Sequence, residues 1–169
     1  MSFFGTDAAA AKAVYFADGT DAHTAIKHMA VDRTMHEPAR FAARHVTATG
    51  QSAWLYRFQY VAESLRPTGT AAHASEVPYV FGVVDARYGA ATTPKDRAMA
   101  DTVMGYIAAF AKTDDPNRSG LPPWPRYDAK RAELMMFTPD GTAVMQTDPW
   151  KSRLDLVERA VEKPAAPPQ

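Results

Sequence analysis

The chain has 169 residues, enough for one domain with its own core, and 46% of them are hydrophobic against 22% charged. Nineteen basic and nineteen acidic residues give no formal net charge and no basic block, so no nucleic acid and no anionic membrane is expected as a partner. The absence of cysteine excludes disulfides and thiol chemistry. No run approaches the ~18 apolar residues of a membrane span, and residues 1–7 lack a signal-peptide pattern. The compartment stays open, because the leader of a longer parent would lie upstream.

Three helices are expected before the first strand. Asp7–Phe16 is rich in alanine and carries apolar residues at helical spacing, and Asp21 can cap a second helix that runs to about residue 29. Asp32–Thr47 predicts a third helix, in which Pro38 lies near the first turns, where a missing N–H costs least. Trp54–Val61 then predicts a core strand, because aromatic residues alternate along it at period two.

The second half of the chain adds helices and a hairpin. Ser75–Phe81 predicts a short turn or helix interrupted by Pro78. Thr93 and Pro94 supply an N-cap and a first-turn proline for a long amphipathic helix that runs to about residue 112. Two apolar runs, at 134–138 and 143–147, flank a turn and predict a hairpin.

The C-terminal end predicts one more helix and a tail. Asp148 and Pro149 begin a helix that is expected to reach about Val161. Residues 162–169 are rich in proline and alanine and are expected to be disordered. Residues 1–161 therefore predict one domain of the α/β class.

Four motifs resemble the type-B carboxylesterases, the cholinesterase-like family of α/β-hydrolases. Thr70–Gly82, which contains His73, is similar to that family's catalytic-histidine stretch, G-A-x-H-x-x-E-[LI]-P-[YF]-V-F-G. Ala108–Asn117 and Leu121–Asp128 resemble its consecutive runs F-A-x-T-G-D-P-N and L-P-x-W-P-x-Y-D. Upstream, Asp32–Arg40 resembles D-x-x-F-x-x-P-x-R. The resemblance covers about residues 3–160 and corresponds to the last third of a family member.

The resemblance implies a fold and one catalytic residue. The fold is the C-terminal part of an α/β-hydrolase, with N-terminal helices, one central strand, a long helix, and a C-terminal hairpin and helix. Trp54–Val61 would be the family's eighth strand, and the loop after it would deliver His73 at the sheet edge where α/β folds place ligands. His73 would be the general base of a serine esterase.

The remaining catalytic parts are not recognisable in this sequence. A serine esterase also needs a nucleophile, an acid that orients the base, and oxyanion donors. Ser52 is the nearest approach to a G-x-S-x-G nucleophile, but Trp54 replaces the second glycine and the segment leads into a strand instead of leaving one. The glycine-rich oxyanion segment is absent, and the family's acid would lie before residue 1.

Other candidate residues have simpler interpretations. Glu76 could orient His73, but the resemblance places it in the buried scaffold, accepting hydrogen bonds from neighbouring backbone. The other histidines fit no metal-binding signature and are expected on ordinary helix surface; they are His23, His28, His36 and His45. No metal and no cofactor is therefore predicted.

Four further features favour structural roles. The alternating aromatic residues of Trp54–Val61 could stack bases or sugars, yet strand packing explains them better. Trp124, between prolines, is expected to pack the loop after the long helix. Asp114 replaces a family glycine, which suggests a different helix end, because aspartate tolerates the left-handed conformation less well. Asn117 begins a glycosylation triplet of a kind that occurs often by chance.

Two functions remain open. In the first, the chain is the part of a serine carboxylesterase that contributes His73, and it meets an ester substrate only together with the missing N-terminal portion. In the second, it is a non-catalytic module that associates with itself or with a partner. A homo-oligomer is expected in either case, through the Trp54–Val61 edge or through an apolar face that the absent sheet would have covered.

Overall fold

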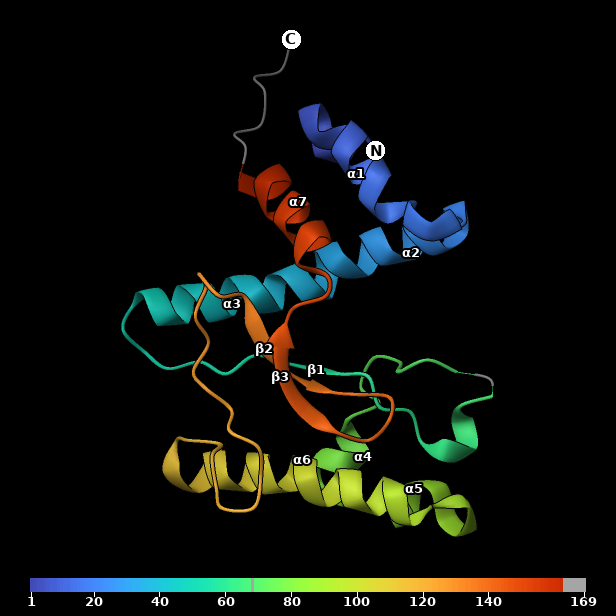
Figure 1. The fold of residues 1–169 in the computed structure, drawn as a ribbon, viewed down its shortest axis with the longest axis vertical. Helices are drawn as coiled ribbons and strands as arrows, with labels where there is room; N and C mark the ends of the chain where they lie inside the picture. The colour runs from blue at the N-terminus through green and yellow to red at the C-terminus, as the bar shows by residue number, and fades with distance from the viewer. Residues whose placement is uncertain (68, 163–169) are drawn as a thin grey trace. The chain divides into compact units, whose positions relative to one another are not determined.

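The computed structural model describes residues 1–67 and 69–162, and these divide into two units (Figure 1). The first unit contains residues 1–53, 128–132 and 147–162, and the second contains 54–127 and 133–146. Most of the tail expected to be disordered, residues 163–169, lies outside the described residues. The assignment of residues 1–161 to one domain stays a prediction. Within the described ranges, no helix combines the length and apolar content that a membrane span requires.

The first unit is helical, as the sequence predicts. Its α-helices are α1 (Ala8–Tyr15), α2 (Ala22–Val31), α3 (Glu37–Ala48) and α7 (Lys151–Glu162). Asp21 caps α2 as expected, because its carboxylate accepts hydrogen bonds from the backbone N–H groups of His23 and Thr24 at 2.9 and 3.0 Å. One π turn at Asp32–His36 joins α2 to α3, so the second and third expected helices form one continuous helical run (Figure 1).

An apolar cluster and an ionic cluster hold the first unit together. The apolar cluster contains Phe4, Ala11, Tyr15, Ala25, Leu156 and Val157, all buried. Each large apolar side chain buried in this way contributes about 1.5–3 kcal/mol. The 3-10 turn Ser2–Asp7 supplies Phe4, whose ring centroid lies 5.7 Å from that of Tyr15. The N-terminal segment and α7 therefore share one core.

Arg40 is the centre of the ionic cluster between α3 and α7. Its guanidinium contacts Glu37 at 2.6 Å, Asp155 at 2.7 Å and Glu158 at 2.8 Å. Both Arg40 and Glu37 are buried, and Arg44 adds further contacts to Glu37 and Glu158 at 2.8 and 3.2 Å. A buried charge of this kind is tolerated only while its partners are present. The inward side of α3 is thus polar.

The second unit contains the sheet and the long helix. Its strands are β1 (Tyr56–Phe58), β2 (Glu133–Phe137) and β3 (Ala143–Thr147), in the order β1-β2-β3. Its helices are α4 (Val77–Val80), α5 (Val84–Tyr88) and α6 (Pro94–Thr113). β1 runs parallel to β2, and the expected hairpin joins β2 to β3 through the turn at 138–142. Met99, Val103 and Tyr106 of α6 pack against Met135 and Phe137 of the sheet in one buried cluster.

The expected strand Trp54–Val61 is too long. Tyr56, Arg57 and Phe58 pair with residues 135–137, and one hydrogen bond at each end extends the ladder to Leu55 and Gln59. The ladder stops because β2 itself ends at Phe137, after which the chain turns into the hairpin. One edge of this strand pairs with β2.

Three local differences between the structure and the expectations from the sequence have simple causes. Pro78 lies in the first turn of α4, where it begins the helix instead of interrupting it. The helix α5 was not predicted, because five residues give no clear periodicity. Asp114 adopts the left-handed conformation at φ 56° and ends α6 as a glycine would, so the different helix end that we expected from it is wrong.

We expect Arg40→Ala to destabilise the protein strongly. The change removes one of the two guanidinium groups that pair with the buried Glu37 carboxylate, and removal of one member of a buried ion pair costs about 3 kcal/mol or more. Chemical denaturation measures the loss. Arg97→Ala is the control, because its pair with Asp85 is exposed and solvent-screened and therefore contributes little to stability. Equal effects of the two substitutions would contradict the structural role of Arg40.

Candidate active-site loop

Asp96 holds the beginning of the loop that carries His73. This carboxylate is fully buried in the first turn of α6. Its Oδ1 accepts hydrogen bonds from the hydroxyl of Tyr60 at 2.7 Å and from the backbone N–H of Glu63 at 3.1 Å. Its Oδ2 accepts from the backbone N–H and the hydroxyl of Thr93, both at 2.9 Å. One carboxylate thus joins the residues after β1 to the N-terminus of α6.

The electrostatics of Asp96 agree with this bonding. Burial opposes ionisation of the carboxyl, but the hydrogen bonds from Thr93, Tyr60 and Glu63 outweigh it and lower the pKa of Asp96. Burial, together with the hydrogen bond to Asp96, raises the pKa of the Tyr60 hydroxyl well above its ordinary value. Asp96 is therefore a charged acceptor and Tyr60 a neutral donor at neutral pH.

Tyr79 holds the other end of the loop. It lies on α4, which begins four residues after His73, and its side chain is buried. Its ring centroid is 5.1 Å from that of Phe58 and 5.5 Å from that of Tyr60. The aromatic residues of β1 therefore contact the segment after the loop as well as support the sheet.

His73 itself is exposed on a tight turn between these two anchors. Ala74 adopts a positive φ of 62°, which costs energy for any residue other than glycine. Backbone hydrogen bonds from Ser75 to Ala72 and from Val77 to Ala74, at 3.1 and 3.2 Å, close the turn. No other residue in the described part of the chain forms a hydrogen bond or an ion pair with the His73 imidazole. A backbone fixed on both sides thus presents an imidazole to solvent.

Glu76 does not orient His73 in this structure. It immediately precedes α4, and its backbone carbonyl accepts hydrogen bonds from Tyr79 and Val80, both at 2.9 Å. Its charge lies close enough to Tyr56 to raise, after burial, the pKa of that hydroxyl. The expected structural role fits this position, but the contacts to neighbouring backbone are made by its main chain and not by its carboxylate.

The remaining histidines and Ser52 give no second site. Ser52 lies in irregular chain between α3 and β1, which is not the strand-to-helix turn that a hydrolase nucleophile occupies. His36 is not ordinary helix surface: its Nδ1 lies 2.8 Å from the buried Asp32 carboxylate, and its ring centroid lies 4.5 Å from that of Trp150. Across residues 1–67 and 69–162, no group of three acidic or histidine side chains could hold a metal ion.

Asn117 and Trp124 brace the loop after α6. Asn117 donates from its side-chain amide to the Trp124 carbonyl at 2.8 Å and accepts from the Trp124 N–H at 2.7 Å. Trp124 is buried in the core of the second unit, which confirms its expected packing role. The Asn117 side chain is thus occupied by structure.

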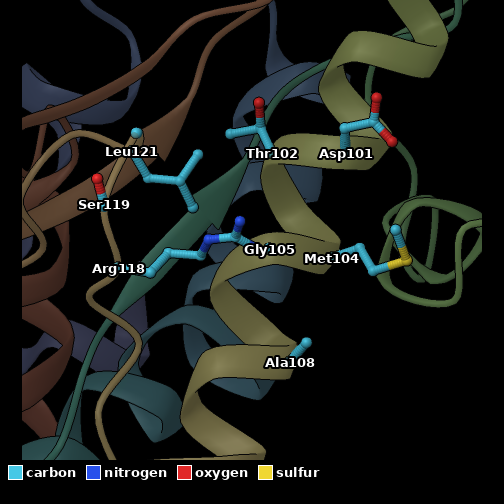
Figure 2. Close-up of a pocket in the computed structure, with 9 residues that line it drawn as sticks. Asp101, Thr102, Met104, Gly105, Ala108, Arg118, Ser119 and Leu121 are labelled. Carbon is cyan, nitrogen blue, oxygen red and sulfur yellow. The ribbon is translucent and has the colours of Figure 1, made fainter.

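A separate open pocket lies between α6 and this loop (Figure 2). Its lining includes Asp101, Gly105, Arg118, Ser119 and Leu121. A Cβ at Gly105 would lie 3.1 Å from the Leu121 side chain, so glycine lets the loop approach the helix. Figure 2 shows Arg118 reaching toward Gly105 while Asp101 points away from it. The lining of this pocket contains no histidine.

The fold and the loop motif together define part of an α/β-hydrolase. A family model described as the carboxylesterase family matches residues 8–156. This chain therefore belongs to the carboxylesterase family.

Relatives and solved structures agree with this family assignment. Carboxylesterase 5A of Canis lupus familiaris is 27% identical over 78% of this chain and 25% of its own length, and liver carboxylesterase 1 of Oryctolagus cuniculus is 32% identical over 64% and 20%. A Geobacillus stearothermophilus carboxylesterase structure matches 85% of this chain and 30% of its own, with 26% identity and a TM-score of 0.69. A PNB esterase structure, at 23% identity and the same TM-score, shows the fold alone and covers 31% of that protein. The chain spans about a quarter of these curated relatives' length.

Sequence reasoning singled out His73, whose catalytic role stays a prediction, and it missed Asp96. The signal was present, because Thr93 and Asp96 have the S/T-x-x-D/E spacing of a capping box, and the structure contains that box. The carboxylate's bonds to Tyr60 and Glu63 are long-range in sequence and left no local pattern.

We expect Asp96→Asn to lower the free energy of unfolding by about 2 kcal/mol or more at neutral pH, because a neutral amide cannot satisfy all four donors. The pKa of Asp96 is lowered in the folded state, so its charge contributes stability above the pKa of the unfolded chain, near 4, and that contribution is lost as pH falls further. Urea denaturation between neutral and acidic pH should therefore show that the free energy of unfolding falls less on acidification in Asp96→Asn than in wild type. Asp101→Asn, exposed on the same helix, should leave the profile unchanged; wild-type stability of Asp96→Asn would contradict the role of this carboxylate.

Proposed function

We propose that this chain is the part of a serine carboxylesterase that supplies the general base, His73. The observation that carries the proposal is the histidine motif, which lies inside the family match over residues 8–156 and on a loop anchored at both ends. An anchored backbone with an exposed imidazole suits a base that must meet a nucleophile from another part of the fold.

The proposed chemistry is hydrolysis of a carboxylic ester in two steps. His73 takes the hydroxyl proton of a serine as its oxygen attacks the ester carbonyl, and it returns that proton to the departing alcohol, leaving an acyl-enzyme. His73 then takes a proton from water, the hydroxide attacks the acyl carbonyl, and the serine regains a proton as the carboxylic acid leaves. Serine, orienting acid and oxyanion donors come from the remaining polypeptide of the fold.

The two imidazole nitrogens of His73 make no hydrogen bond to a described residue, which is consistent with a nucleophile and an orienting acid that come from the rest of the fold. A base needs one imidazole nitrogen for the nucleophile and the other for an orienting carboxylate. The charge of Glu76 acts on Tyr56, whose pKa it helps to raise, and no described carboxylate bonds to His73. Both nitrogens are therefore open to groups that the rest of the fold would bring.

A non-catalytic module is the second candidate function. The observation that favours it is an exposed apolar row on α2 and α3, which gives the chain a surface for association without any chemistry. The two candidates differ in whether His73 is required, and the next two experiments address this.

The 169-residue chain by itself should not hydrolyse p-nitrophenyl acetate through an acyl-serine. A fluorophosphonate probe, which labels only activated serines, should leave it unlabelled in mass spectrometry, because Ser52 lies outside a nucleophile turn. Any weak turnover by exposed imidazoles should fall only in part in His73→Ala, because His23, His28 and His45 are exposed as well. Stoichiometric labelling of Ser52 would contradict the proposal that the nucleophilic serine comes from the remaining polypeptide.

When this chain is joined to the rest of the fold, His73→Ala should lower kcat by about 10³-fold or more, because the base acts in the transition state. Thermal unfolding should be nearly unchanged, since His73 is exposed. His45→Ala, an exposed histidine on α3, is the control and should retain full activity. Activity above one tenth of wild type in His73→Ala would assign the base to another residue and favour the non-catalytic candidate.

A further inference from the structure

Arg66 lies between the anchored start of the loop and His73. The 3-10 turn Glu63–Leu65 begins at the backbone N–H that donates to Asp96. Arg66 directly follows this turn, and residues 67–72 then lead to His73. A contact that holds Arg66 therefore brings the fixed part of the chain closer to the candidate base.

The Arg66 side chain contacts groups on both sides of the loop start. Its Nε donates to the Val61 carbonyl at 3.2 Å, and its Nη2 donates to the Pro139 carbonyl at 2.9 Å. The guanidinium also lies over the ring of Tyr60, 5.3 Å from the centroid. A further contact, to Glu63 at 3.4 Å, is partly exposed and adds little. Arg66 thus joins the loop to the hairpin turn between β2 and β3.

The hairpin turn that receives the guanidinium is itself well held. The backbone N–H of Thr138 donates to the Thr142 carbonyl at 2.9 Å and closes the turn. Gly141 adopts a φ of 93°, and a Cβ there would lie 2.7 Å from the Lys95 side chain and 3.5 Å from the Tyr60 ring. Glycine therefore lets the turn pack against the first turn of α6 and against Tyr60.

We propose that Arg66 is a positioning residue for His73: by tying the loop to the hairpin, it narrows the range of positions that the imidazole samples. Asp96 fixes the chain at Glu63, and Arg66 extends the fixed part further toward His73. A shorter free segment has fewer conformations, so the base is placed more narrowly. The effect on the loop is independent of catalysis, whereas the effect on the reaction rests on the proposed function of His73.

Nitrogen-15 relaxation of the 169-residue chain tests the effect on the loop. Arg66→Met keeps the length of the side chain but removes its charge and its donors. In this variant the order parameter of the His73 amide should fall from about 0.85, typical of rigid backbone, to below about 0.6. Arg66→Lys should give an intermediate value, because an ammonium group cannot reproduce the fixed donor geometry of a guanidinium.

Arg87→Met is the matched control for this measurement. Arg87 is also exposed and its guanidinium also lies over an aromatic ring, that of Tyr88 at 5.8 Å, but it belongs to α5. Its substitution should leave the His73 order parameter at the wild-type value. An unchanged order parameter in Arg66→Met, or an equal fall in Arg87→Met, would overturn the proposal.

Kinetics of the chain joined to the rest of the fold test the effect on the reaction. Arg66→Met should lower kcat about fivefold with KM nearly unchanged, because a displaced base slows the chemical step while substrate contacts stay. Arg66→Lys should recover part of the loss. Unchanged kcat, in a protein that His73→Ala inactivates, would overturn the positioning role. Activity retained in His73→Ala would instead contradict the proposed function, and the order parameters would still decide whether Arg66 positions the loop.

Discussion

The hydrogen bonds of one buried carboxylate organise the part of the fold that carries the candidate base. Asp96 accepts hydrogen bonds from the hydroxyl of Tyr60, just after β1, and from the backbone N–H of Glu63 at the start of the following loop. It also accepts one from the backbone N–H of Thr93, the N-cap of α6. A buried charge is costly unless it is fully hydrogen-bonded, and four donors meet that condition here. The same arrangement that stabilises the charge therefore fixes where the loop to His73 leaves the sheet.

The segments on both sides of the His73 loop are fixed, while His73 itself is exposed. The rings of Phe58 in β1 and of Tyr60 after it contact Tyr79, so the segment after the loop is fixed by packing while the segment before it is fixed by Asp96. Between them, His73 is exposed on a turn closed by its own backbone. A hydrolase that builds its active site from separate regions needs each region to hold its residue firmly before they meet. The chain belongs to the carboxylesterase family, and the catalytic role of His73 on this loop is our proposal.

The features that sequence predicted are those with local physical causes. Asp21 caps α2, and Thr93 with Pro94 begins α6, because cap chemistry depends on neighbouring residues alone. The hairpin follows for the same reason. The length of β1 depends on its partner strand, and the buried contacts of Arg40 with α7 join residues far apart in sequence, so neither had a local signal. His73 was singled out through its motif and its catalytic role stays a proposal, whereas the carboxylate that supports its loop was visible only as part of a helix cap.

Amide hydrogen exchange at Glu63 tests the central claim most directly, because this N–H donates to Asp96 at the start of the loop. In Asp96→Ala the Glu63 amide should exchange about tenfold faster or more than in wild type, since the bond that protects it is gone. The Met135 amide, which bonds to Leu55 inside the sheet, should keep its wild-type rate under conditions where the variant stays folded. An unchanged rate at Glu63, or an equal acceleration at Met135, would contradict a specific role of Asp96 in holding the loop.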